Sequence, residues 1–167
     1  MNRLFALFVM FIPSFLIANP IEVGEKAPTV TVTTHTGEQL DLAEAYAIGP
    51  VLIYFYPRAE TPGCTRQACN IRDNFDAIES YGLTILGVSR DSVEKLAEFQ
   101  SNHELPFTLI ADEDRVLGGA FKVGSWMGMA YRRQTFLVVD GVVAWRDLSA
   151  SPDSQSEDAL AALRAMN

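Results

Sequence analysis

Hydrophobic residues along this chain gather in short runs that are separated by polar segments and by glycine or proline. Residues 51–56 are apolar without a break and end at Pro57, which predicts a strand buried on both faces of a sheet. Similar patterns predict further strands at residues 30–33, 83–89, 107–110, 135–139 and 142–145. Between the strands we expect helices at residues 41–47, 64–80, 93–102, 115–121 and 156–166.

The order of these elements indicates an α/β architecture. Asp140-Gly141 separates the last two expected strands, and this dipeptide is a strong signal for a tight antiparallel hairpin. Strand–helix–strand units that precede such a hairpin and a final helix predict a sheet with a parallel core and an antiparallel edge. The periodicity alone does not choose among the α/β folds that share this order.

Composition and charge narrow the class of protein. The 167 residues are 49% hydrophobic and 20% charged, without a repeat or a low-complexity segment, so we expect one domain over residues 19–167. The net charge of −8 argues against nucleic acid or an anionic membrane surface as a partner. The two histidines and two cysteines lack the spacing of a zinc site, and no metal is expected.

The first 18 residues form a separate segment. Residues 4–17, which follow Arg3, are apolar apart from Ser14, and this stretch is shorter than the ~20 residues that span a bilayer. The pattern predicts a secretory signal peptide over residues 1–18 with cleavage after Ala18. An uncleaved N-terminal membrane anchor is the alternative. Both interpretations place the folded domain in an exported, oxidising compartment such as the periplasm.

The first of the two cysteines, Cys64, follows a turn. Pro57 ends the expected strand, Pro62-Gly63 makes a tight turn, and Cys64 then falls in the first turn of the expected helix. Free backbone N–H groups and the positive end of the helix dipole stabilise an anion at that position. Because the thiolate is the nucleophilic form of cysteine, Cys64 is a candidate reactive residue.

The spacing between Cys64 and Cys69 indicates a redox pair. Residues with this spacing in an ideal helix have Cα atoms ~8–9 Å apart, whereas a disulfide needs about 7 Å or less. A bond between the two cysteines therefore requires the first turns of the helix to unwind. A couple that switches a helix end between wound and unwound fits this spacing better than a structural disulfide. Two half-buried cysteines that never meet are the alternative.

Several short motifs resemble one enzyme family. Residues 57–64, Pro-Arg-Ala-Glu-Thr-Pro-Gly-Cys, match the P-x-x-x-T-x-x-C signature of peroxiredoxins. The longer run over residues 54–73 resembles the Q-type subfamily, also called bacterioferritin comigratory proteins. Matching blocks follow in family order at residues 87–92, 105–107 and 133–137, and the resemblance covers residues 22–145.

The resemblance implies a thioredoxin-like fold, with a mixed central sheet flanked by helices, and thiol-dependent peroxidase activity. In this chemistry the Cys64 thiolate attacks hydrogen peroxide or an organic hydroperoxide and becomes a sulfenic acid. Cys69 resolves the sulfenic acid as an intramolecular disulfide, which a thioredoxin-like dithiol then reduces. The scheme needs no metal, haem or flavin cofactor. One subunit completes it, so a monomer is expected.

The resemblance also implies roles for four residues around Cys64. Arg133 matches the family's active-site arginine, whose charge would stabilise the thiolate and bind the substrate. The Thr61 hydroxyl would bond the peroxide or the sulfur, although position alone predicts that it caps the helix. Pro57 would shield the pocket, and the backbone N–H of Gly63 would contact the substrate.

Two other functions stay open at this point. The first alternative is an exported thiol–disulfide oxidoreductase, although the chain lacks a Cys-x-x-Cys pair. The second is a non-enzymatic secreted domain with a permanent Cys64–Cys69 disulfide. We expect His35 and His103 to lie away from the cysteine motif. Residues 125–130 either pack in the core, line a pocket for organic hydroperoxides or dock a reductant.

Overall fold

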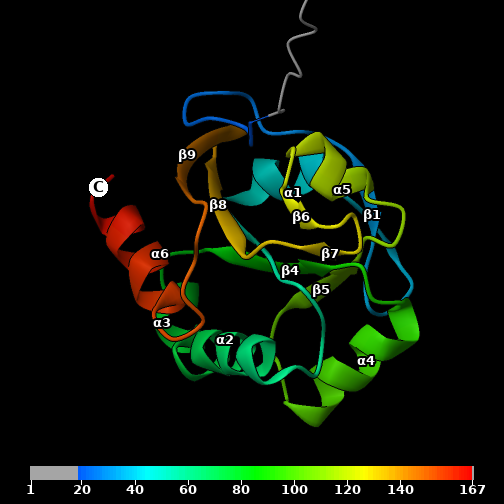
Figure 1. Cartoon of the computed structure of the whole chain (residues 1–167). Helices are drawn as coiled ribbons and strands as arrows, with labels where there is room; N and C mark the ends of the chain where they lie inside the picture. The colour runs from blue at the N-terminus through cyan, green and yellow to red at the C-terminus, as the bar shows by residue number, and fades with distance from the viewer. Residues whose placement is uncertain (1–18, 167) are drawn as a thin grey trace, which may run out of the picture.

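The computed structural model describes residues 19–166 and centres on a five-stranded mixed sheet (Figure 1). The strands of this sheet are β3 (Val51–Phe55), β4 (Thr84–Ser89), β5 (Thr108–Ala111), β8 (Gln134–Val139) and β9 (Val142–Asp147). Their order is β5-β4-β3-β8-β9. Strands β3, β4 and β5 are parallel, and β8 and β9 continue the sheet antiparallel on the other side of β3. The predicted parallel core with an antiparallel edge is confirmed.

Helices cover both faces of the sheet. They are α1 (Leu42–Ile48), α2 (Pro62–Asp73), α3 (Phe75–Glu79), α4 (Val93–Asn102), α5 (Val116–Ala120) and α6 (Gln155–Arg164). In Figure 1, α2, α3, α4 and α6 lie on one side of the sheet, and α1 and α5 lie on the other.

The central strand β3 contributes to the hydrophobic cores on both faces. Leu52 and Tyr54 pack in the core on the α2 side. Val51, Ile53 and Phe55 pack in the core on the α1 side. Successive side chains of a strand point to opposite faces, and here both faces are covered, which explains why the whole run is apolar.

Two small hairpins lie outside the central sheet. They are β1 (Thr31–Thr33) with β2 (Gln39–Asp41), and β6 (Ser125–Trp126) with β7 (Ala130–Tyr131). Strands β2, β6 and β7 are absent from the sequence-based prediction because strands this short show no alternating pattern. The predicted Asp140-Gly141 hairpin is confirmed, and both residues have positive φ, 51° and 73°, as a type I′ turn requires.

The predicted helix over residues 64–80 is wrong at its start and in its middle. Helix α2 begins at Pro62, so Pro62-Gly63 is the first part of the helix and not the predicted turn. It ends at Asp73, and the C-cap residue Asn74 has a φ of −109° and a ψ of 13°. The Asn74 side chain donates a hydrogen bond from Nδ2 to the carbonyl oxygen of Asn70 at 2.9 Å. Asparagine side chains compete in this way with the backbone hydrogen bonds of a helix. The short α3 then begins as a separate element.

Two features of the described residues bear on membrane and metal binding. Within residues 19–166, no helix combines the length and the hydrophobicity of a membrane span. In the same range, histidine, cysteine and acidic side chains form no group of three or more that could hold a metal ion. The predicted signal peptide, residues 1–18, lies outside the described residues.

Candidate active site

Cys64 lies just beyond the carboxyl end of the central strand β3, in the first turn of α2. Thr61 is the N-cap of this helix, and Pro62 occupies its first position, where a missing N–H costs nothing. Cys64 is 1% exposed and packs in the core on the α2 side. The first-turn position agrees with the prediction, and it places the sulfur where a helix favours negative charge.

The Arg133 guanidinium lies beside this sulfur, and its Nη2 donates to Cys64 Sγ at 3.5 Å. Arg133 directly precedes β8, and the register pairs Phe55 of β3 with Gln134 of β8. The arginine therefore lies at the same end of the strands as the loop that follows β3. A Cβ atom at Gly63 would come within 3.2 Å of Nη2, so the glycine leaves room for the guanidinium.

A series of buried side chains holds the other arm of the guanidinium. Arg133 Nη1 donates to Gln67 Oε1, and Gln67 Nε2 donates to Gln155 Oε1. Gln155 Nε2 then donates to Thr135 Oγ1 at 2.9 Å. Gln67, Gln155 and Thr135 are 0%, 1% and 0% exposed. We call this series the glutamine relay. It holds the Arg133 amino group that does not contact the sulfur, and it crosses from α2 through α6 to β8.

Gln67 and Gln155 are absent from the site residues that the sequence predicts. Gln67 follows Cys64 by three positions in one helix, so the two side chains lie on the same face. A polar residue on that buried face is a signal that something must bind it. No comparable signal marks Gln155, because 88 residues separate it from Gln67.

Cys69 is half-buried, and both cysteines are free thiols. Helix α2 runs without a break from Cys64 to Cys69, and the structure is the dithiol form of the protein. An intact helix holds residues at this spacing too far apart for a disulfide. A bond between them therefore requires α2 to unwind, as the spacing predicts.

Thr61 stands at the N-cap position, but its side chain does not cap the helix. Its backbone is extended (φ −81°, ψ 147°), and no helical N–H donates to its hydroxyl. Oγ1 instead donates to the carbonyl oxygen of Arg58 at 3.0 Å. The expected cap is therefore wrong for the side chain, because the hydroxyl bonds back to the loop that precedes α2.

We call residues 57–61, which precede α2, the cysteine loop, and a hollow of about 350 Å³ opens beside it. Pro57 and Arg133 both line it. The complete lining is Pro57, Trp126, Arg132, Arg133, Leu148, Ser149 and Ala150.

The segment 125–130 does not pack in the core, so that interpretation of it is wrong. Trp126, Met127 and Met129 are 60%, 90% and 69% exposed. The Arg132 guanidinium stacks over the Trp126 ring, 4.9 Å from its centroid, in a cation–π contact. This contact holds the indole at the rim of the hollow.

His103 contacts the cysteine loop, contrary to the sequence-based expectation. Glu60 of that loop accepts a hydrogen bond from Asn102 Nδ2 at 2.9 Å and pairs with His103 Nε2 at 3.0 Å. These bonds, first that of His103 and then that of Asn102, lower the pKa of Glu60. The expectation fails because the end of α4 meets the loop across 43 residues of sequence. His35 lies elsewhere, where Nδ1 accepts from the Leu109 N–H at 3.2 Å.

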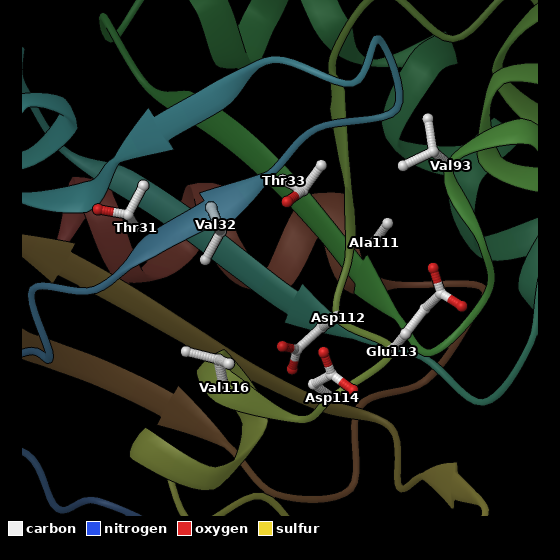
Figure 2. A pocket seen from close by; sticks show the side chains of 9 residues that line it. All are labelled: Thr31, Val32, Thr33, Val93, Ala111, Asp112, Glu113, Asp114 and Val116. Carbon is white, nitrogen blue, oxygen red and sulfur yellow. The ribbon is translucent and has the colours of Figure 1, made fainter.

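A second hollow, of about 170 Å³, is shown in Figure 2 and is lined by none of the predicted site residues. Asp112 borders it, but the Asp112 carboxylate has its own partners. It accepts from the N–H groups of Leu117 at 3.0 Å and Gly118 at 2.8 Å, and from the Tyr131 hydroxyl at 2.5 Å. We assign Asp112 a structural role because these donors satisfy its oxygens.

Comparisons with known proteins point to one family. The AhpC/TSA family matches residues 23–146. Peroxiredoxin Bcp of Escherichia coli (strain K12) is 42% identical over 132 residues, which are 75% of this chain and 84% of the relative. Peroxidoxin BcpB of Mycobacterium tuberculosis has a TM-score of 0.83 and 31% identity, over 88% of this chain and 99% of its own. The bacterioferritin comigratory protein of Xanthomonas campestris has a TM-score of 0.79 and 29% identity, over 87% and 99%.

A thioredoxin-like sheet with a cysteine at the helix start after its central strand, together with these relatives, identifies the class of protein as a thiol-dependent peroxidase. Within that class, the chain belongs to the AhpC/TSA family, as a peroxiredoxin of the Bcp/PrxQ type. The predicted fold and the peroxidase function are thereby confirmed, and the oxidoreductase and non-enzymatic alternatives are disfavoured. The roles of single residues stay predictions.

Proposed function

We propose that this chain reduces hydroperoxides with Cys64 as the attacking nucleophile. The observation that carries the proposal is the position of Cys64 in the first turn of α2, with Arg133 Nη2 at 3.5 Å from its sulfur. The helix start and the guanidinium both place positive charge at the sulfur. The same groups stabilise the negative charge that develops on the departing oxygen.

In the first step, the Cys64 thiolate attacks one peroxide oxygen, and the O–O bond breaks. The sulfur keeps that oxygen as a sulfenic acid, while the other oxygen leaves as hydroxide or alkoxide and takes up a proton. The sulfur loses two electrons and the peroxide gains them. Arg133 binds the peroxide oxygens and holds them in line with the sulfur.

In the second step, the Cys69 thiol attacks the sulfenic sulfur of Cys64, forms a disulfide and releases water. Helix α2 unwinds between the two cysteines to allow this bond. A thioredoxin-like dithiol then exchanges with the disulfide and is itself oxidised. The sequence of steps uses no metal, haem or flavin. Both cysteines belong to one chain, so a monomer is sufficient.

Thr61, Gly63 and Pro57 shape the place where the peroxide binds. The Thr61 hydroxyl uses its proton in the bond to the Arg58 carbonyl, so toward the substrate it acts as an acceptor for the peroxide O–H. Gly63 permits the close approach of the Arg133 guanidinium, and its backbone N–H contacts the substrate. Pro57 shields the pocket without adding a donor.

The substrate class includes organic hydroperoxides as well as hydrogen peroxide. The hollow of about 350 Å³ beside Arg133 has apolar walls from Trp126 and Leu148, which suit an alkyl group. The Xanthomonas campestris relative is described by its alkyl peroxide reduction activity, which supports the same substrate class here.

We also propose that the domain works outside the cytoplasm, in the periplasm of a bacterial host. The support is the apolar stretch at residues 4–17, which is too short for a comfortable membrane span. Fractionation of host cells and N-terminal sequencing test this. A periplasmic chain that begins after Ala18 is expected, an intact chain in the membrane fraction supports the anchor, and an intact soluble cytoplasmic chain contradicts export.

Peroxide consumption tests the proposed chemistry. Reduced protein receives hydrogen peroxide or cumene hydroperoxide, with dithiothreitol as the dithiol. We expect turnover by the wild type and no protein-dependent consumption by Cys64→Ser. Cys69→Ser is the matched control, because it removes a thiol from the same helix and still reacts once with peroxide. Consumption by Cys64→Ser at the wild-type rate would rule out Cys64 as the nucleophile.

A further inference from the structure

The glutamine relay connects the C-terminal helix α6 with the arginine beside the reacting sulfur. Its members Gln67, Gln155 and Thr135 are all buried, and buried polar groups need hydrogen-bond partners. They bond to one another in a single series that begins at Arg133. The relay therefore lies next to the proposed chemistry without touching the substrate.

Arg133 sets the direction of every hydrogen bond in the relay. A guanidinium only donates, so the Gln67 atom that faces it is the carbonyl oxygen Oε1. The NH₂ group of Gln67 then faces α6 and needs an acceptor, which is Gln155 Oε1. The NH₂ group of Gln155 needs an acceptor in turn, which is Thr135 Oγ1 at 2.9 Å. Each amide thus has one orientation that satisfies its partners.

We propose that Gln155 is a positioning residue for the peroxidase reaction. It locks the Gln67 amide in the orientation that holds Arg133 against Cys64 Sγ, and this inference rests on the proposed function of those two residues. Without Gln155, the Gln67 NH₂ group has no acceptor, and the Gln67 side chain loses the bond that fixes its position. The Gln67 oxygen is then no longer held at the guanidinium. Arg133 then loses the anchor that keeps its other arm at the sulfur.

The start of α6 is fixed on α2 next to Gln155. The Ser156 N–H donates to Asn70 Oδ1 at 3.1 Å, and Asn70 Nδ2 donates to the Asp153 carbonyl oxygen at 3.2 Å. Figure 1 shows α6 beside α2, and the two helices are in contact. The backbone on both sides of Gln155 is therefore bonded to α2, and this fixes the position of Gln155 in the relay.

The relay affects the two chemical steps differently. The peroxide step uses Arg133 and therefore depends on the relay. The resolving step requires α2 to unwind between Cys64 and Cys69, and Gln67 lies in that stretch. Gln67 must leave the relay before the disulfide forms, so loss of Gln155 slows the first step and does not slow the second.

Stopped-flow measurement of both steps in the full chain tests the proposal. Gln155→Met has a similar volume and removes both hydrogen bonds, and we expect the second-order rate constant with hydrogen peroxide to fall about 10–100-fold. The rate of disulfide formation should stay the same or rise. Gln155→Glu keeps an oxygen acceptor for Gln67 Nε2 in either protonation state, so its peroxide rate should stay within about threefold of the wild type.

Two other substitutions in α6 serve as matched controls. The Ser156 hydroxyl is buried and has no hydrogen-bond partner within residues 19–166, so Ser156→Ala should leave both rates unchanged. Leu160 is 6% exposed and lies outside the relay. Leu160→Ala should lower Tm and leave the peroxide rate unchanged, which is the pattern of a purely structural residue.

The proposal is overturned if Gln155→Met lowers Tm while its peroxide rate equals that of the wild type. Where Gln155→Met does not fold, Thr135→Val breaks the relay at its far end and must show the same slowing, and a wild-type rate there also overturns the proposal. A wild-type protein that does not react with peroxide through Cys64 would instead overturn the proposed function.

Discussion

Each face of the central sheet contains a buried polar network. One network contains only structural groups, and the other ends at the sulfur of Cys64. On the α1 side, the Asp112 carboxylate receives the N–H groups of Leu117 and Gly118 and the hydroxyl of Tyr131. A Cβ atom at Gly118 would overlap the Tyr131 ring, so the glycine makes this contact possible. Burial and then the bond to Asp112 raise the pKa of Tyr131, which keeps its hydroxyl a donor. All members of this network have structural roles.

On the α2 side, the glutamine relay ends at Arg133, and Arg133 ends at the sulfur of Cys64. Both networks consist of buried polar groups that satisfy one another, and they differ in the group at the end of the series. A network that closes on structural groups stabilises the fold. A network that ends at a reacting atom also sets the position of that atom, so its loss is measured as a rate.

Removal of the closed network should have the largest effect on stability. Asp112→Ala leaves two backbone N–H groups and the Tyr131 hydroxyl without their acceptor in a buried site. We expect the free energy of unfolding to fall by about 3–5 kcal/mol, measured by urea denaturation. The folded protein should keep the wild-type rate constant with peroxide. A loss of stability below about 1 kcal/mol, or a slower peroxide reaction, would break the contrast between the two networks.

Removal of the charge at the end of the relay should affect the rate. We expect Arg133→Met to slow the reaction of Cys64 with hydrogen peroxide about 10²–10³-fold, the scale seen when one preorganised group is lost. Arg133→Lys keeps the charge but lacks the two-armed geometry that reaches both the sulfur and Gln67, so its rate should be intermediate. Single-turnover stopped-flow kinetics measure both variants. An unchanged rate in Arg133→Met would show that the guanidinium has no part in the chemistry.

The contacts between α6 and α2 should oppose the unwinding that the disulfide requires. Asn70→Ala removes two hydrogen bonds that hold α2 to the start of α6. Because one or two kcal/mol correspond to a factor of about 5–30, we expect disulfide formation after oxidation to become faster by that factor.

The matched control for Asn70→Ala is Asp153→Ala at the same interface. It breaks the exposed Arg66–Asp153 ion pair, whose side chains are 59% and 68% exposed, and such pairs contribute little. Its disulfide should form at nearly the wild-type rate. Slower resolution in Asn70→Ala would mean that the interface assists unwinding.

The smallest expected effect concerns the cysteine loop and its bond to α4. Hydrogen bonds from His103 and Asn102 lower the pKa of Glu60 from 4.5, so folding favours the ionised carboxylate. The resulting stability is present above the ordinary value and is lost as the pH falls through the lower, folded value. The Tm advantage of the wild type over Glu60→Gln should therefore shrink from pH about 6 to about 3. The Glu60 side chain is 39% exposed, so the effect is modest, and a constant difference over that range would disprove it.

Local sequence predicts the elements that place Cys64. The apolar run at residues 51–56, the start of α2 at Pro62 and the Asp140-Gly141 hairpin are each encoded by neighbouring residues. The position of Cys64 follows from the same signals, because a proline that begins a helix places a cysteine two residues later in the first turn. The break at Asn74 is also local, but it depends on which bond an asparagine side chain chooses.

The partners that complete the site come from distant parts of the chain. Gln67 and Gln155 are 88 residues apart, and Glu60 and His103 are 43 residues apart. No periodicity or motif connects such pairs, because only the packing of α6 and α4 on the sheet brings them together. Sequence therefore predicts the reacting atom, and the structure is needed to find the residues that hold its neighbours.

A count of free thiols after one equivalent of hydrogen peroxide tests whether Cys64 is the residue that reacts and Cys69 the residue that resolves it. The protein starts fully reduced, with Cys64 and Cys69 both free. We expect rapid loss of both thiols in the wild type, of none in Cys64→Ser and of one in Cys69→Ser. Slow loss in all three proteins, or rapid loss of a thiol in Cys64→Ser, would contradict a peroxidatic Cys64 that is resolved by Cys69.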